Sequence, residues 1–211
     1  MLNLYTTPLS ANGRKVLAVS RELGLCPVIH LIDVYRGEGR TAEYLAVNPS
    51  GKIPILVDGE FTLAESNAIS IYLAEVHGAY HLWSRDAPVR SRIAQWLFWE
   101  SSQWQPALSA ILSELVGHRL LPDKIPRPRS APDWNSGPLQ ALFKLLENTL
   151  SSQSFLAGEE LTIADFSVAG MTTYFRAADF PFHTYPAVSR WYDRIEALDS
   201  WRETAAPLWS A

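Results

Sequence analysis

The spacing of apolar residues changes near residue 83, and this change constrains the fold more than any other feature of the chain. Before it, short alternating runs typical of β-strands are interleaved with runs of helical period; after it, only helical runs remain. The expected order over residues 1–80 is β-α-β-α-β-β-α, a small mixed sheet with helices. We therefore predict an α/β domain over residues 1–80 and an all-α helical bundle over residues 87–211.

Local signals define several elements of the first domain. Residues 2–5 alternate, and residues 28–32 are rich in β-branched side chains, so both are predicted strands. Residues 55–57 and 61–63 are apolar and flank Asp58-Gly59-Glu60. Because Asp-Gly between apolar runs favours a tight turn, this segment predicts a β-hairpin.

The second half contains two further signals and one long loop. A tryptophan-rich helical stretch is expected from Asp86 towards Val116, and the proline-rich segment 122–138 is expected to be an extended loop. Thr162 and Asp165 have the spacing of a capping box, in which each side chain binds a backbone N–H of the first helical turn. This pattern assigns Asp165 a structural role rather than a catalytic one.

Composition excludes several classes of protein. The chain is 47% hydrophobic, which excludes a disordered segment, and its single cysteine, Cys26, excludes a disulfide scaffold. No apolar run is long enough to cross a bilayer, the first residues lack the pattern of a signal peptide, and the net charge of -4 disfavours nucleic acid as a partner. His77 and His81 are separated by a helix-ending Gly78, so no metal site is expected. We expect a soluble cytoplasmic protein.

Four segments, in this order along the chain, carry a resemblance to a known family: residues 4–16 (LYTTPLSANGRKV), 48–56 (NPSGKIPIL), 63–69 (LAESNAI) and 156–165 (LAGEELTIAD). The chain resembles the cytosolic glutathione transferases, and within them the serine-type phi and nu-like bacterial members. The resemblance covers essentially the whole sequence. It implies a thioredoxin-like N-terminal domain, an all-α C-terminal domain, glutathione as cosubstrate without a metal, a homodimer and a role in detoxification.

The resemblance assigns activation of the glutathione thiol to Ser10 or Asn12. A thiol with a pKa near 8.5 is only a few per cent ionised at neutral pH, so the protein must stabilise the thiolate by about two pKa units. Ser10 aligns with the serine of the serine-type members. Asn12 is the alternative donor, because nu-like members carry Asn-Gly two residues after a Thr or Ser. Both side chains are also good helix caps, which is the purely structural alternative.

Five further residues are implied to bind glutathione. Ile53-Pro54 is expected to be a cis peptide that presents the main chain of Ile53 to the cysteinyl residue. Lys52 would meet the glycyl carboxylate. Ser66, at a helix start, would bind the γ-glutamyl carboxylate, and Glu65 its amino group.

Three positions depart from the family pattern or need an assignment. Phi-class members usually carry a histidine where Gly39 stands, so Arg40 replaces it or Lys52 acts alone; both alternatives stay open. Tyr5 lies too early in its strand to be the catalytic tyrosine of other classes and is assigned to packing. Cys26 lies far from the cysteine position of the omega- and beta-like members, which argues against a protein mixed disulfide.

The second substrate is expected between the domains, against Leu9 and the tryptophan-rich helix, with Trp104 as a pocket wall. The leading interpretation is conjugation of glutathione to a small apolar electrophile. The first alternative is glutathione-dependent reduction of peroxides or disulfides, as in the nu-like proteins. The second is a transferase fold that binds ligands or partners without turnover.

Overall fold

The computed structural model describes residues 1–7, 9–120, 126, 132–134, 136–176 and 178–205. The chain forms two compact units, one of Met1–Asp86 together with Glu196–Ala211, and one of Ala87–Ile195. Residues 196–205, which the sequence placed with the helical domain, thus group with the α/β unit. Within that unit, the last helix contacts the first.

The first unit has the predicted order of strands and helices, with two short 3₁₀ turns and one C-terminal helix added. Its four-stranded sheet has the order β2-β1-β3-β4. β1 runs parallel to β2 and antiparallel to β3, and β3 and β4 form the predicted hairpin. The elements are β1 (Leu2–Thr6), α1 (Ala11–Glu22), β2 (Val28–Leu31), η1 (Val34–Arg36), η2 (Glu38–Arg40), α2 (Ala42–Val47), β3 (Ile55–Asp58), β4 (Phe61–Ala64), α3 (Ser66–Val76) and α9 (Asp199–Arg202).

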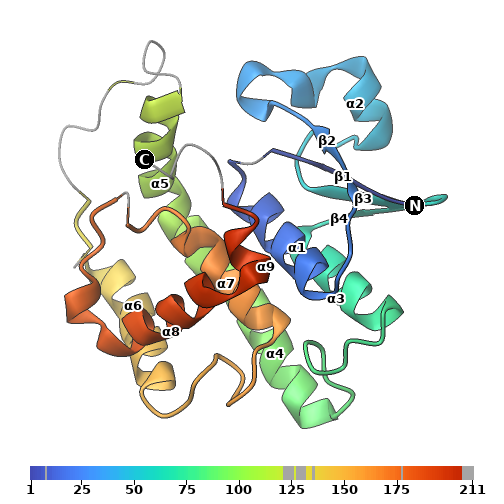
Figure 1. The fold of residues 1–211 in the computed structure, drawn as a ribbon. Coiled ribbons are helices and arrows are strands. Elements are labelled where there is room, and N and C mark those ends of the chain that lie inside the picture. Colours follow the sequence, from blue (N-terminus) through green and yellow to red (C-terminus); the bar gives the residue numbers. More distant parts are fainter. Residues whose placement is uncertain (8, 121–125, 127–131, 135, 177, 206–211) are drawn as a thin grey trace. The chain divides into compact units, whose positions relative to one another are not determined.

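Helices cover both faces of this sheet. Figure 1 shows α1 and α3 on one face and α2 on the other. Leu4 and Leu56, which are register partners on β1 and β3, are fully buried, as are Val16 of α1 and Ile69 of α3. These apolar side chains form the core that anchors the N-terminal ends of α1 and α3 at one end of the sheet.

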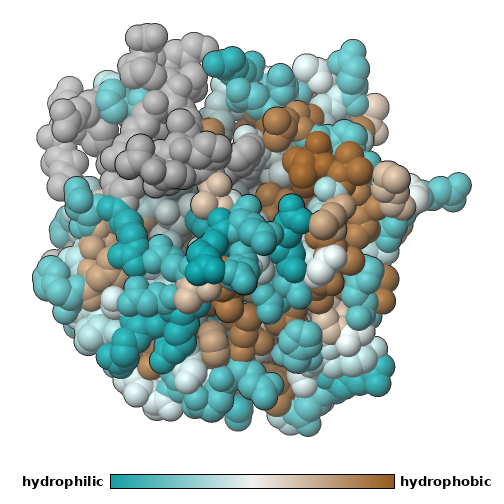
Figure 2. Space-filling model, in the orientation of Figure 1, coloured by the Kyte–Doolittle hydropathy of each residue, from teal (hydrophilic) through white to brown (hydrophobic). Residues whose placement is uncertain are grey.

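β2 is an edge strand with exposed apolar side chains. Val28, Ile29 and Leu31 are 42%, 40% and 65% exposed. Figure 2 shows apolar surface over the region where Figure 1 places β2. His30, between them, is half-buried because its ring stacks on Tyr5 of β1.

The second unit contains the expected helices. They are α4 (Ala87–Trp99), a π-helical segment η3 (Glu100–Trp104), α5 (Gln105–Leu120), α6 (Gly137–Leu150), α7 (Ile163–Thr172), the 3₁₀ turn η4 (Phe182–Thr184) and α8 (Pro186–Ala197). The predicted extended loop 122–138 lies mostly outside the described residues. Among the described helices, none is long and apolar enough to cross a membrane.

The π-helical segment has a local cause. The Gln105 N–H donates to the Glu100 carbonyl, five residues earlier rather than four. Pro106 follows directly, and because it lacks an N–H and its ring crowds the preceding turn, a regular α-helix cannot run through this segment.

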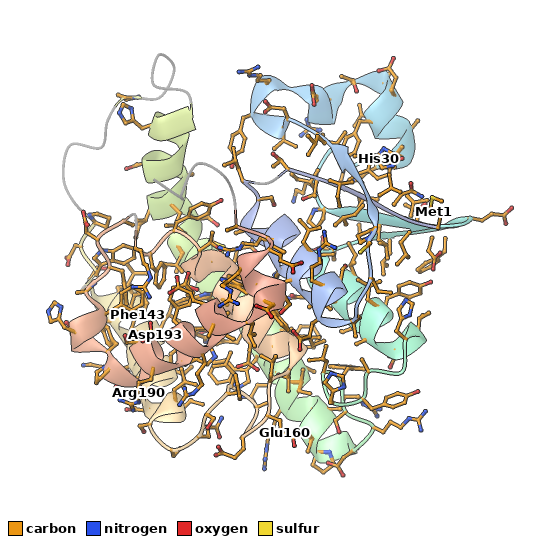
Figure 3. All side chains as sticks on the ribbon, viewed as in Figure 1. Met1, His30, Phe143, Glu160, Arg190 and Asp193 are labelled. Atoms are coloured by element: carbon orange, nitrogen blue, oxygen red, sulfur yellow. The ribbon has the colours of Figure 1, made fainter. Side chains whose placement is uncertain are left out.

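Aromatic rings fill the core of the second unit. Phe143 of α6 lies 5.2 Å from the ring of Trp104 and 4.7 Å from that of Phe180, measured between centroids. Figure 3 labels Phe143 within this cluster. The predicted capping box is confirmed: the Thr162 side chain accepts from the first turn of α7, and Asp165 accepts from the Thr162 N–H at 2.9 Å.

Candidate functional site

The strand register brings three loops together at one end of the sheet. Tyr5 pairs with Ile55, and Ile55 pairs with Ala64. Because β3 is antiparallel to both neighbours, the chain after β1, the chain before β3 and the chain after β4 meet at the same edge. The residues predicted to activate and bind glutathione in this unit follow or precede these three strand ends.

Ser10 caps α1 through its hydroxyl oxygen. This oxygen accepts a hydrogen bond from the Gly13 N–H at 3.0 Å, and the Ser10 main chain is extended, as at other N-caps. Capping uses the oxygen only as an acceptor. The hydroxyl proton of Ser10 can therefore still be donated to an anion in front of the helix.

Asn12 and Ser66 connect the N-termini of α1 and α3. The Ser66 hydroxyl donates to the Asn12 side-chain oxygen at 3.4 Å, and Ser66 is buried. Each helix carries partial positive charge at its N-terminus, so the place where the two ends meet favours an anion. Because the Asn12 side-chain oxygen accepts from Ser66, the NH₂ group of Asn12 points the other way. This NH₂ group has no acceptor among the described residues, so it can donate to a ligand.

Glu65 has an unusual main-chain conformation at the start of α3. Its φ is +67°, in the left-handed region that favours glycine, and its side chain does not cap the helix. An exposed, non-glycine residue held at positive φ often indicates a functional site. Glu65 is therefore exposed and its carboxylate does not cap α3, whereas the next residue, Ser66, is buried.

The segment before β3 presents an unused stretch of main chain. The Ile53–Pro54 peptide bond is cis, as predicted. The carbonyl of Lys52 accepts two short hydrogen bonds, from the Tyr44 hydroxyl and the Asn48 amide, each at 2.6 Å. The N–H and C=O of Ile53, by contrast, have no hydrogen-bond partner within the described parts of the chain. They are suited to pairing with an extended ligand.

Gly39 and Gly51 touch through their main chains. A Cβ atom built on Gly39 would lie 2.5 Å from the Gly51 oxygen, and one built on Gly51 would lie 2.5 Å from the Gly39 oxygen. No side chain fits at position 39 without moving a loop, so the histidine that the family resemblance led us to expect could not be accommodated here. The Arg40 guanidinium lies over Gly51, 3.2 Å from the position of such a Cβ, and so next to the exposed Lys52.

Sequence reasoning missed the contact between Thr6 and Gly13. A Cβ on Gly13 would lie 1.9 Å from the Thr6 hydroxyl oxygen, which is buried and has no hydrogen-bond partner among the described residues. The end of β1 can approach the first turn of α1 this closely only because residue 13 is glycine. A glycine inside a predicted first turn, where it disfavours helix, was the available signal.

Reasoning from the sequence also missed the buried contact between Arg14 and residues 201–204. The Arg14 guanidinium donates to the Thr204 hydroxyl at 3.3 Å and to the Trp201 carbonyl at 3.2 Å. Ser200 donates to Glu22 at 2.6 Å near the other end of α1. Both ends of α1 are therefore hydrogen-bonded to residues of the segment 200–204.

Tyr5 and Cys26 lie apart from the helix N-termini. The Tyr5 ring stacks on His30 with centroids 4.4 Å apart and faces α2, and Figure 3 places His30 on that side of the sheet. Cys26 follows the C-terminal end of α1 and accepts a hydrogen bond from Arg21 at 3.0 Å. Both positions agree with the structural assignments made from the sequence.

The two residues predicted for the electrophile pocket belong to different units. Leu9 is half-buried in the turn before Ser10. Trp104 is fully buried in the second unit, where its indole N–H donates to the Val168 carbonyl at 3.1 Å and its ring stacks on Trp99. Trp104 is thus part of the bundle core, and its role as a pocket wall stays a prediction. Among the described residues, no group of three His, Cys, Asp or Glu side chains could hold a metal ion.

Comparison with family models matches both halves of the chain. Residues 4–81 match the glutathione S-transferase N-terminal domain, and residues 105–199 match the glutathione S-transferase C-terminal domain. Glutathione S-transferase F10 of Arabidopsis thaliana is 30% identical over 98% of this chain and 97% of its own length. Human glutathione S-transferase theta-2 is 30% identical over 93% of this chain and 81% of its own length.

Solved structures are similar over the same extent. Glutathione transferase F7 from Populus trichocarpa superposes with a TM-score of 0.87 at 27% identity, covering 97% of this chain and 98% of that one. A glutathione S-transferase-I bound with lactoylglutathione superposes with a TM-score of 0.86 at 26% identity, again covering 97% and 98% of the two chains.

Proposed function

Because the chain belongs to the cytosolic glutathione S-transferase family, we propose that it transfers the glutathione thiolate to a small apolar electrophile, with Ser10 and Asn12 stabilising the thiolate. The observation that carries this proposal is the hydrogen bond between Ser66 and Asn12, which places the N-termini of α3 and α1 together. Ser10 caps the same end of α1 and keeps its proton available. Two helix N-termini and two neutral donors favour the charged form of a bound thiol and so lower its pKa.

The remaining groups account for the charged ends of glutathione. Ser66 would bind the γ-glutamyl carboxylate through its N–H and, when its hydroxyl proton turns from the Asn12 oxygen to the ligand, through its hydroxyl as well. The exposed carboxylate of Glu65 would pair with the amino group. The main chain of Ile53 would pair with the cysteinyl residue. Lys52, with Arg40 beside it, would meet the glycyl carboxylate.

The proposal extends to the second substrate and to the assembly. Leu9, directly before Ser10, would supply apolar surface next to the reacting sulfur. Trp104 would form another wall of the electrophile pocket. A cytoplasmic homodimer is proposed from the family resemblance. Light scattering on the purified full chain measures the mass and so tests the dimer.

A thiol titration tests the mechanism. The thiolate absorbance of bound glutathione is followed against pH for the native protein, Ser10→Ala and Asn12→Ala. Loss of a donor to the charged sulfur should raise the bound thiol pKa by about one unit or more. Ser152→Ala and Asn148→Ala, at exposed positions of the second unit, are matched controls that should leave it unchanged. If neither site variant raises the pKa, the activation mechanism is wrong.

The second candidate is glutathione-dependent reduction of peroxides or disulfides, favoured by the Ser10-Ala11-Asn12-Gly13 sequence and the available NH₂ group of Asn12. Parallel assays with an aryl halide, cumene hydroperoxide and a hydroxyethyl mixed disulfide separate it from conjugation. A non-catalytic binding protein would bind glutathione without turnover in any of the three assays.

A further inference from the structure

A pocket of about 440 Å³ lies on the α2 side of the sheet, away from the helices α1 and α3. Its lining comes from β1, the end of β2, η2 and α2, and none of the residues that line it is among those proposed to bind glutathione. The lining residues are Tyr5, Ile32, Glu38, Thr41, Glu43, Tyr44 and Val47.

Aromatic rings form part of the lining, and they are held in place. Tyr5 and Tyr44 have their ring centroids 6.2 Å apart at an angle of 44°. His30 stacks on Tyr5 and is itself hydrogen-bonded to Asn3 at 2.9 Å. The Tyr44 hydroxyl donates to the Lys52 carbonyl, and burial raises the pKa of Tyr44, so this donor keeps its proton. Both rings are therefore pre-organised before any ligand arrives.

The formal charges in the lining are all negative. Glu38 and Glu43 are exposed carboxylates, and the lining contains no lysine, arginine or histidine. One Glu38 oxygen accepts the Asp33 N–H at 2.6 Å, which fixes the carboxylate.

The arginines nearest to these carboxylates in the sequence, Arg36 and Arg40, are not among the lining residues. Arg36 pairs with Asp33 at 3.5 Å, and Arg40 lies over Gly51. The lining offers a ligand two carboxylates, two tyrosine side chains, one threonine and two aliphatic side chains.

This combination fits one class of ligand. Tyrosine rings attract cations through their electron-rich faces, and nearby carboxylates add Coulomb attraction without requiring a hydrogen-bond donor. The aliphatic side chains of Ile32 and Val47 suit the carbon substituents of an organic cation better than a hydrated metal ion. We propose that this pocket is a second ligand site, distinct from the glutathione site, that binds a small aromatic or N-alkylated organic cation.

Calorimetry on the full chain tests the site with benzyltrimethylammonium as the probe. One binding event per chain is expected, and the neutral benzyl alcohol and the anionic phenylacetate should not bind. Glu38→Gln combined with Glu43→Gln should weaken binding about tenfold. Glu159→Gln combined with Glu160→Gln removes the same charge from exposed positions in the second unit and should leave the affinity unchanged. Absence of binding, or equal weakening by both pairs, overturns the proposal.

Ring variants and competition complete the test. Tyr5→Phe keeps the ring and should bind within about twofold of the native protein, whereas Tyr5→Leu should lose about tenfold. The N-methyl protons of the bound probe should shift upfield because they lie against the rings. Saturating glutathione should not change the affinity for the probe. Competition would show that the probe occupies the glutathione site and would overturn the proposal, while leaving the proposed transferase activity intact.

Discussion

The guanidinium of Arg14 lies 4.1 Å above the centroid of the Trp201 ring and donates to the main-chain oxygen of the same residue. Arg14 is two positions after Asn12 and only 8% exposed. The position of the first turn of α1, and with it the proposed thiol site, therefore depends on contacts with Trp201.

Replacement of Arg14 by Ala should lower the free energy of unfolding by about 2–3 kcal/mol, because it removes two buried hydrogen bonds to a charged group and a cation–π contact. Arg14→Lys keeps the positive charge but lacks the planar guanidinium. Its free energy of unfolding should lie between those of Arg14→Ala and the native protein. Urea denaturation measures both. Arg92→Ala, at an exposed position of α4, is the control and should change stability little. An Arg14→Ala protein as stable as the native one would show that the contacts of Arg14 with Trp201 and Thr204 do not stabilise the fold.

Replacement of Gly13 by Ala should destabilise the protein by about 1–3 kcal/mol, since the new methyl group overlaps the Thr6 side chain. Thr6→Ala in the same chain removes the overlapping atoms and should recover most of the loss, a coupling that a double-mutant cycle measures. Gly137→Ala, where a Cβ meets open space, should be neutral or stabilising. Additive effects of the first two changes would contradict the close contact.

The stability contributed by Asp165 should fall as pH rises. Burial raises the pKa of Asp165, and hydrogen bonds from Leu156, Trp191 and Thr162 oppose that rise. A carboxyl whose pKa is higher in the folded state binds its proton more tightly there. Its contribution is therefore largest below the ordinary value of 3.8 and decreases as pH rises towards the folded-state pKa.

The measurement for Asp165 is the difference in unfolding free energy between the native protein and Asp165→Ala, followed from acid to neutral pH. Groups that titrate in both proteins cancel in this difference. A difference that increases with pH over this range would show that the hydrogen bonds outweigh burial.

Removal of the charge of Lys52 should raise the KM for glutathione severalfold and change kcat less, because the glycyl carboxylate does not react. With a glycyl ethyl ester of glutathione, which lacks that charge, Lys52→Ala and the native protein should behave alike. Arg40→Ala, run beside it, shows which of the two cations carries the contact. Arg190→Ala, exposed in the second unit, is the charge control. If neither Lys52→Ala nor Arg40→Ala distinguishes acid from ester, the glycyl end is bound elsewhere.

Local patterns were sufficient for the order of the secondary-structure elements. The hairpin at Asp58-Gly59-Glu60 and the capping box of Thr162 and Asp165 depend on residues within a few positions, and both are confirmed. The cis peptide at Ile53–Pro54, which the family resemblance implied, is confirmed as well. For the hairpin and the capping box the physical cause lies within a few residues, so the local sequence contains it.

Contacts between distant residues could not be predicted in this way. Arg14 meets Trp201 across 187 positions and Tyr44 meets Lys52 across a loop, and neither pair has a spacing that signals it. Trp104 shows the same limit, because only its packing against Phe143 and Phe175 identifies it as a core residue. Such assignments depend on the tertiary arrangement.

The contact between Gly39 and Gly51 limits the routes by which this chain could evolve. A histidine at position 39, the residue that the family resemblance led us to expect, would collide with the Gly51 carbonyl, and a change at Gly51 would collide with Gly39 in turn. Gly51 also has a φ of +68°, so other residues are strained there regardless of space. A histidine at position 39 therefore cannot be introduced by one substitution while the two loops keep their present positions. The loop would first have to be remodelled, and until then binding of a glycyl carboxylate would depend on the proposed contacts of Arg40 and Lys52.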